Sequence, residues 1–182
     1  VSPDNLQPSG DLSTDLGAAG PEGDSTGLTY TFTPKAGDTG FSVDVVLFSE
    51  ELPEFDGTSL SDLFSIKLNG KEVGTLSNGA ALSIKNLVYG GSGDLILNPV
   101  GTGALADTIK ADAYTKTLTI SGPLDPGVAN TLTIEVKDGR DAFLDSGLLI
   151  KDGSFKTIVM PEVGIGFDPG AGGSGVGGVT VI

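Results

Sequence analysis

The segment from Phe41 to Leu68 constrains the fold most, because it joins two apolar strand patterns through a dense acidic run. Apolar residues occupy every second position of its first part: Phe41, Val43, Val45 and Leu47. This period of two predicts a strand that buries one face. A second strand pattern, Leu63 to Leu68, begins directly after the acidic run. The acidic run must therefore connect two strands of a folded core.

Five carboxylates stand between these two strands with no lysine or arginine among them: Glu50, Glu51, Glu54, Asp56 and Asp62. Like charges this close repel one another. Calcium accepts six to eight oxygen ligands, which carboxylates on an irregular loop supply. We therefore expect bound Ca2+ to neutralise this segment, and the alternative is an acidic loop that water alone solvates.

A second acidic segment, DGRDAFLDS, carries Asp138, Asp141 and Asp145. Its spacing lacks the D-x-D-x-D-G pattern and the closing Glu of an EF-hand, so that motif does not match. We expect these aspartates to bind metal as well; alternatively, Arg140 pairs with one of them and the loop is merely polar. A weaker acidic set lies in the amino-terminal arm, where solvated charge is the favoured interpretation: Asp11, Asp15, Glu22 and Asp24.

Composition excludes several classes of function. The formal net charge is −14, and the chain has neither histidine nor cysteine. Such a chain offers no basic patch for nucleic acid or anionic membranes, no disulfide, and no imidazole or thiolate for zinc. No apolar run reaches the roughly 18 residues of a membrane helix. Without histidine there is no Ser–His dyad, and the adjacent Glu50 and Glu51 would face opposite sides of a strand. We therefore do not expect an enzyme.

The remaining chain consists of short strand patterns separated by turn residues, with no helical period. This arrangement predicts an all-β fold, an antiparallel β-sandwich with long calcium-binding loops. Asn69-Gly70 predicts a type I′ hairpin, and Lys151 to Gly153 a hairpin between Leu148–Ile150 and Phe155–Val159. Further strands are expected at Gly27–Thr33, Ala80–Val88, Asp94–Leu97, Leu105–Ala111, Tyr114–Ile120 and Thr131–Val136.

The composition also divides the chain. Residues 1–160 are expected to form the sandwich, a ligand-binding domain, with residues 1–25 as an amino-terminal arm. Residues 161–182 are glycine-rich and typical of a linker or tail. Within them, Val179 to Ile182 is an alternative edge strand. We expect a monomeric module within a larger protein.

Four blocks of this sequence resemble the choice-of-anchor L domain family: FSEELPEF, SDLFSIKLNG, LSIKNL and VKDGRDAFLDSGLLIKDGSF. Their order and spacing agree with the family over about Gly27 to Phe155. The specific parts are Ser49-Glu50-Glu51, Pro53-Glu54-Phe55, Asp145-Ser146 and Gly153-Ser154-Phe155. The sequence departs from the family at Leu52, where Tyr is usual, and at Ser65, Lys67 and Ala142.

The resemblance implies an extracellular protein of the bacterial cell surface. Related modules occur in large repeats-in-toxin adhesins, which act in cell adhesion and biofilm formation. These modules are similar to calcium-dependent domains that capture the free carboxyl end of a partner peptide. It therefore implies recognition of protein ends on a host or neighbouring cell. We expect the ligand contacts at Ser49, Glu51, Asp141 and Ser146. Two alternatives remain, a spacer domain that calcium only stiffens and a calcium-dependent lectin that binds glycans.

Overall fold

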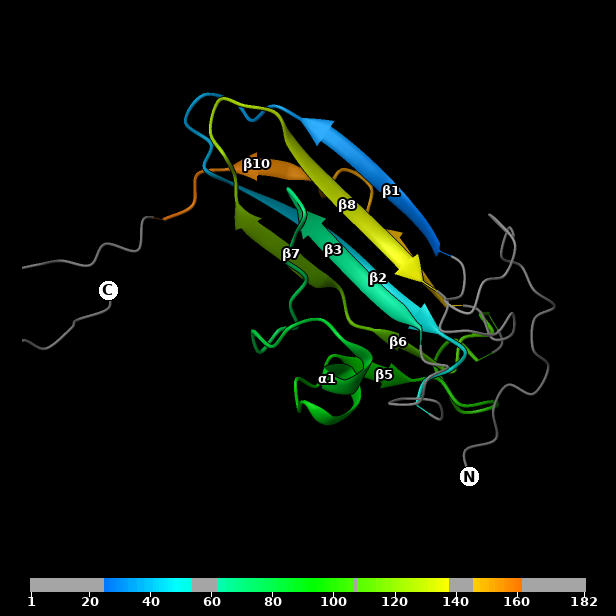
Figure 1. Cartoon of the computed structure of the whole chain (residues 1–182). Coiled ribbons are helices and arrows are strands. Elements are labelled where there is room, and N and C mark those ends of the chain that lie inside the picture. Colours follow the sequence, from blue (N-terminus) through cyan, green and yellow to red (C-terminus); the bar gives the residue numbers. More distant parts are fainter. Residues whose placement is uncertain (1–24, 54–61, 107, 138–145, 162–182) are drawn as a thin grey trace, which may run out of the picture.

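The computed structural model describes residues 25–53, 62–106, 108–137 and 146–161, which form two antiparallel sheets (Figure 1). Sheet A has the order β1 (Ser25–Phe32), β8 (Asn130–Lys137), β3 (Leu63–Leu68) and β4 (Lys71–Glu72). Sheet B is built on β2 (Gly40–Ser49). Along one edge of β2 lie β10 (Lys156–Ile158) and β9 (Ser146–Ile150), and along the other lie β7 (Leu118–Pro123) and β6 (Ala113–Thr115). β5 (Leu95–Leu97) pairs with β6.

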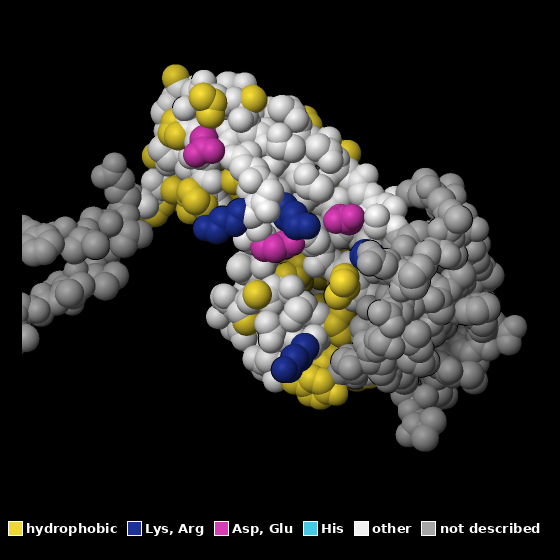
Figure 2. Space-filling model, viewed as in Figure 1, with side chains coloured by type: hydrophobic (Ala, Val, Ile, Leu, Met, Phe, Trp, Pro, Cys, Tyr) yellow, Lys and Arg dark blue, Asp and Glu magenta, His cyan; other side chains and the backbone are white. Residues whose placement is uncertain are grey.

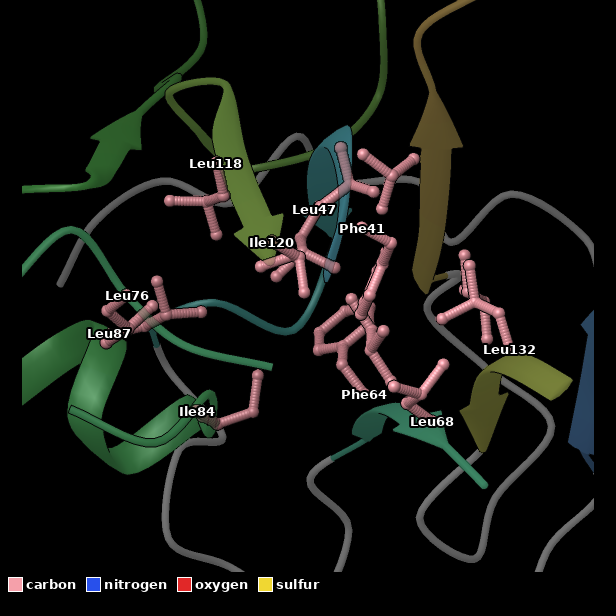
Figure 3. Packing of buried hydrophobic residues seen from close by; sticks show 14 of the residues in the cluster. Phe41, Leu47, Phe64, Leu68, Leu76, Ile84, Leu87, Leu118, Ile120 and Leu132 are labelled. Atoms are coloured by element: carbon pink, nitrogen blue, oxygen red, sulfur yellow. The ribbon is translucent and has the colours of Figure 1, made fainter. Parts of the chain in front are cut away.

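The core lies between the two sheets, as an all-β sandwich requires (Figure 3). The four alternate residues of β2 that the sequence placed on one face are each at most 1% exposed: Phe41, Val43, Val45 and Leu47. Sheet A contributes the opposing side chains, among them Ile66 of β3 and Ile134 of β8, which are 0% and 5% exposed. Burial of this apolar surface is the main stabilising term of the fold, and it confirms the predicted class.

The predicted turn at Asn69-Gly70 is confirmed. Leu68 pairs with Lys71, so the hairpin loop has two residues. Asn69 has φ = 50° and Gly70 has φ = 79°, the left-handed pair that a type I′ turn requires. Asparagine and glycine tolerate this region better than other residues do. The local sequence therefore sets the register between β3 and β4.

The strand expected at Ala80–Val88 is wrong, because the chain forms the short helix α1 (Ile84–Tyr89) there. Ser83 is its N-cap, and the Ser83 Oγ accepts a hydrogen bond of 3.1 Å from the backbone N–H of Asn86. Ile84 and Leu87, three residues apart, are the buried positions of the helix, which is the spacing of a helical face. Capping and this single apolar pair override the apparent alternation.

The strand expected at Leu105–Ala111 is also wrong for the residues that are described there. The side chain of Asn98 accepts a hydrogen bond from the backbone N–H of Leu105 and donates one to the carbonyl of Ala111, at 2.9 Å each. Asn98 is completely buried. A side chain that satisfies backbone groups in this way replaces a strand partner, so the segment folds as turns around Asn98.

The segment Lys151 to Gly153 is not a hairpin between paired strands. β9 and β10 do not pair with each other; both pair with the same edge of β2. The backbone N–H of Lys151 donates to the carbonyl of Asp44 at 3.0 Å, and the N–H of Ser154 donates to the carbonyl of Lys151 at 3.1 Å. The segment is therefore a turn that interrupts one continuous edge. A smaller break also divides Tyr114–Ile120 between β6 and β7.

Candidate functional site

Both acidic segments connect the two sheets at the same end of the sandwich. The first leaves sheet B after Ser49 and enters sheet A at Leu63, and the second leaves sheet A after Lys137 and enters sheet B at Ser146. Leu63 pairs with Lys137, and Ser49 pairs with Ser146. We call this end, defined by these four residues, the acidic end. The fold therefore places the residues that flank the two segments beside each other, although the segments are distant in sequence.

Ser49 is a buried residue of the acidic end that bonds to two neighbouring segments. It is completely buried, between Ser146 of β9 and Ala113 of β6. Its Oγ accepts a hydrogen bond of 2.9 Å from the backbone N–H of Glu51, and its carbonyl accepts one of 3.1 Å from the N–H of Asp112. Because the hydroxyl is buried and bonded to the next turn, Ser49 is suited to positioning Glu51.

Three of the predicted carboxylate residues are described, and all three are buried. Glu51 and Asp62 are 4% exposed, and Glu50 is 8% exposed. The Oε2 of Glu51 accepts a hydrogen bond of 2.8 Å from the backbone N–H of Asp62, so the two ends of the first acidic segment meet. Withdrawing a carboxylate from water costs several kcal/mol unless hydrogen bonds or cations compensate. A fold that buries three of them here holds them by specific interactions.

Asp112 belongs to the same end, although the sequence analysis did not identify it. It is 8% exposed, and besides its bond to Ser49 its carbonyl accepts a hydrogen bond of 2.7 Å from the N–H of Asn98. In sequence it is a lone aspartate between two alanines, Ala111 and Ala113, which are both buried in the fold. Asp112 thus adds a fourth buried carboxylate residue beside Ser49.

Ser146 carries the one buried side-chain polar atom of the described residues that lacks a hydrogen-bond partner, its Oγ. It pairs with Ser49 across β2 and β9, so both side chains point to the same face of sheet B. A buried hydroxyl without a partner loses its hydrogen bonds to water and gains none in return. The atom is thus a donor and acceptor that a ligand at the acidic end could use.

The other predicted metal ligands lie outside the described residues: Glu54, Asp56, Asp138, Asp141 and Asp145. The amino-terminal acidic set and the glycine-rich tail also lie outside them. Within the part of the chain that the structure describes, no group of three or more acidic side chains is arranged to hold a metal ion. The Ca2+ site therefore remains a prediction that depends on both acidic segments together.

Two other aspartates have structural partners and lie outside the acidic end. Burial of Asp94 disfavours its charge, but hydrogen bonds from the Ser77 side chain and backbone N–H, one from Ser92 and the charge of Lys116 together hold its pKa below the usual value. For Asp44, a hydrogen bond of 2.8 Å from the Thr119 hydroxyl is the main cause of a lowered pKa. These carboxylates stabilise loops and edges, and neither is a candidate for ligand binding.

The charge on the described surface is mixed. In the view of Figure 2, Lys and acidic side chains are interspersed on the described face, and neither sign forms a broad patch. Within the described residues, no helix is long and apolar enough to cross a membrane. Neither family models, curated proteins nor solved structures yield a match to this chain. Its function must therefore be argued from the acidic end itself.

Proposed function

We propose that this chain is a calcium-dependent ligand-binding domain of a bacterial surface adhesin, and that it recognises the free carboxyl end of a peptide or protein. One observation carries the proposal: both acidic segments cross between the sheets at the same end. Ser49 and Ser146 pair there, and Leu63 and Lys137 pair there. The resemblance to the choice-of-anchor L family supports the same assignment.

The charge of this end explains why a cation is needed. The two segments carry eight carboxylates and one arginine in sequence: Glu50, Glu51, Glu54, Asp56, Asp62, Asp138, Asp141 and Asp145 against Arg140. A ligand carboxylate would be repelled by such a site. A divalent cation reverses the local charge, and the six to eight ligands of calcium leave room for an oxygen from a bound peptide.

The described residues have distinct roles in this proposal. Glu51 is fixed from both sides, by the Ser49 Oγ at its backbone and by the Asp62 N–H at its carboxylate. In the proposed site this positioned carboxylate is a cation ligand. The Ser146 hydroxyl, which lacks a partner, would donate to the ligand. Asp141 is the further ligand contact that we expect from the sequence.

The test is a peptide array that compares free with amidated carboxyl ends, in calcium and in chelator. We expect binding only for free carboxyl ends and only with calcium. Calcium-dependent stabilisation without any peptide binding would instead favour a spacer, and calcium-dependent binding to a glycan array would favour a lectin. Equal binding of free and amidated peptides would contradict the proposed recognition of carboxyl ends.

A further inference from the structure

No strand of the described ranges pairs with the outer edge of β9. Within the described residues, β9 pairs with β2 and with no other strand. The N–H of Lys151 donates to the carbonyl of Asp44, so alternation directs the backbone groups of Leu149 and Gly147 toward β2 as well. The N–H and C=O groups of the intervening residues therefore point to the free edge: Ser146, Leu148 and Ile150.

Two bonds on the other side of β2 support this assignment. The Leu47 N–H donates to the Thr115 Oγ1 at 3.0 Å, and the Ser49 carbonyl accepts from Asp112. Leu47 and Ser49 thus direct their backbone groups away from β9. Their partners in register, Leu148 and Ser146, are then non-hydrogen-bonded positions, as alternation requires.

Strand β1 extends past sheet B above this edge. Leu28 and Tyr30 pair with Ile134 and Leu132, which are buried, so their side chains point to the inner face of sheet A. Yet Leu28 is 52% exposed and Tyr30 is 47% exposed. An inward-facing apolar side chain stays exposed only where the opposite sheet does not reach it.

Phe155 packs against the inner face of β1. The ring of Phe155, which lies between β9 and β10 in the chain, packs edge-on against Tyr30 at 5.2 Å and Phe32 at 4.8 Å. Ile150 of β9 faces the same interior, because it pairs with buried Val45, and it is 40% exposed. Leu28, Tyr30 and Ile150 are thus partly exposed apolar side chains that face the interior, and we call the surface that they form with the outer edge of β9 the apolar space.

We propose that the peptide ligand binds in this space as an added strand, antiparallel to β9. This inference rests on the proposed function and specifies how the ligand lies. β9 runs from the acidic end at Ser146 toward Ile150. An antiparallel peptide runs the opposite way, so its carboxyl end arrives beside the unpaired Ser146 hydroxyl at the acidic end. Strand addition of this kind draws affinity from backbone hydrogen bonds and selectivity from alternate side chains.

The edge also defines the chemistry of the ligand. β1 carries no charged residue over its eight positions, in a chain whose net charge is −14. The side chains that the space offers to a peptide are apolar: Leu28, Tyr30 and Ile150. The ligand is therefore an extended, uncharged carboxyl-terminal segment with apolar, preferably β-branched, residues at alternate positions.

Hydrogen exchange by NMR tests the strand directly. The probe is a pool of octapeptides with free carboxyl ends and Val, Ile, Leu or Thr in the last five positions, added to the full chain in millimolar calcium. We expect the amides of Ser146, Leu148 and Ile150 to exchange at least tenfold more slowly when the pool is bound. The amides of Gly147, Leu149 and Lys151, which already bond to β2, should change little. Unchanged exchange at the first three amides would overturn the inference.

A matched pair of variants on β1 tests the apolar space. Leu28→Gln removes an inward-facing apolar side chain, whereas Thr29→Gln alters the outer face of the same strand. In the proposed complex the peptide buries the exposed half of the Leu28 side chain. Losing this apolar burial should weaken binding of the fluorescein-labelled pool roughly five- to tenfold in Leu28→Gln, whereas Thr29→Gln should change it little. Equal effects of the two substitutions would contradict the proposed position.

The outcomes separate this inference from the proposed function. If binding needs calcium and a free carboxyl end but the β9 amides do not exchange more slowly, the proposed function is supported and the added strand is overturned. If the β9 amides also exchange more slowly with amidated peptides in chelator, strand addition is supported and the proposed function is overturned. Absence of binding overturns both. A concentration-dependent dimer that protects the same amides without peptide would assign this edge to a second copy and overturn the inference.

Discussion

Substitution of Glu51 by glutamine separates the electrostatic cost of the acidic end from its ability to bind calcium. Glutamine retains an oxygen that can accept the hydrogen bond from the Asp62 N–H, now 2.8 Å from the Glu51 Oε2. It removes one negative charge from a residue that is only 4% exposed. The substitution therefore changes the charge of the acidic end and leaves its shape nearly unchanged.

Without calcium, two effects of this change oppose each other. A hydrogen bond to a neutral acceptor contributes about 1 kcal/mol less than one to a carboxylate. Removing one of several neighbouring negative charges gains a similar amount. We expect the free energy of unfolding of Glu51→Gln in chelator to lie within about 1 kcal/mol of the parent value.

With calcium, the two proteins should differ clearly. Free calcium at a hundredfold excess over its dissociation constant stabilises the native state by about 2.7 kcal/mol. For a domain of this size that corresponds to a rise in Tm of roughly 5–10 °C. Glu51→Gln should lose most of this rise, because the affinity of a calcium site depends on the number of charged ligands and a neutral amide attracts the cation less than a carboxylate does.

The assay is thermal unfolding followed by circular dichroism, in calcium and in chelator, for three proteins. The matched control is Glu72→Gln, which removes the same charge from β4, where Glu72 pairs with Lys67 at 3.6 Å. Glu72 is exposed, so its ion pair contributes little, and the control should retain the full calcium-dependent rise. No rise in the parent protein, or an undiminished rise in Glu51→Gln, would refute the reasoning.

Three further predictions concern the fold. Ile66→Ala, at a completely buried position of β3, should lower the free energy of unfolding in urea by about 2–5 kcal/mol, and a loss below 1 kcal/mol would contradict its place in the core. Asn130→Ala should cost about 2–4 kcal/mol in the same assay, because the buried side chain makes four hydrogen bonds of 2.9–3.0 Å. Asp94→Asn should cost about 1–2 kcal/mol at neutral pH. Because the native pKa of Asp94 is lowered, this difference is complete above the unfolded pKa of about 3.9 and disappears as pH falls through the native pKa; a difference independent of pH would contradict the role of its charge.

The sequence predicted the parts of the fold that depend on local alternation. β2, β3 and β8 carry apolar residues at every second position, on their buried face, and each lies within two residues of its expected bounds. Helix α1 was missed because six residues present only one pair of buried positions, Ile84 and Leu87. The turns after Asn98 were missed because they depend on a side chain that bonds to backbone groups up to 13 residues away.

The candidate site was predictable in part. The acidic runs identified Glu50, Glu51 and Asp62, but their meeting point required the pairing of Ser49 with Ser146. Asp112 was not predictable, because a lone aspartate between alanines has no distinctive pattern. It joins the site only because β6 pairs with the last residues of β2. Contacts set by strand pairing between distant segments have no local signal.

Buried polar side chains at the two ends of the sandwich find their hydrogen-bond partners in different ways. At the end opposite the acidic end, Asn69 and Asn130 bond to each other at 3.0 Å, and the Asn69 Oδ1 accepts from the Thr131 N–H at 2.8 Å. An amide both donates and accepts, so Asn69 also donates to the Asp125 carboxylate at 3.0 Å while Asn130 accepts from the Asp125 N–H at 3.0 Å. Ionised carboxylates only accept, and therefore cannot bond to one another.

A cluster of carboxylates thus depends on donors or cations from elsewhere. At the acidic end, backbone N–H groups supply some of these donors, as the Asp62 N–H does for the Glu51 carboxylate. Each N–H, however, bonds to one oxygen and carries no full charge. Calcium supplies both charge and several coordination positions. At the Asn69–Asn130 end, amides bridge backbone groups and the Asp125 carboxylate, whereas the acidic end combines buried carboxylate residues with the unpaired Ser146 hydroxyl. This asymmetry is what a domain needs if one end is to stay closed while the other receives a cation and the end of a peptide.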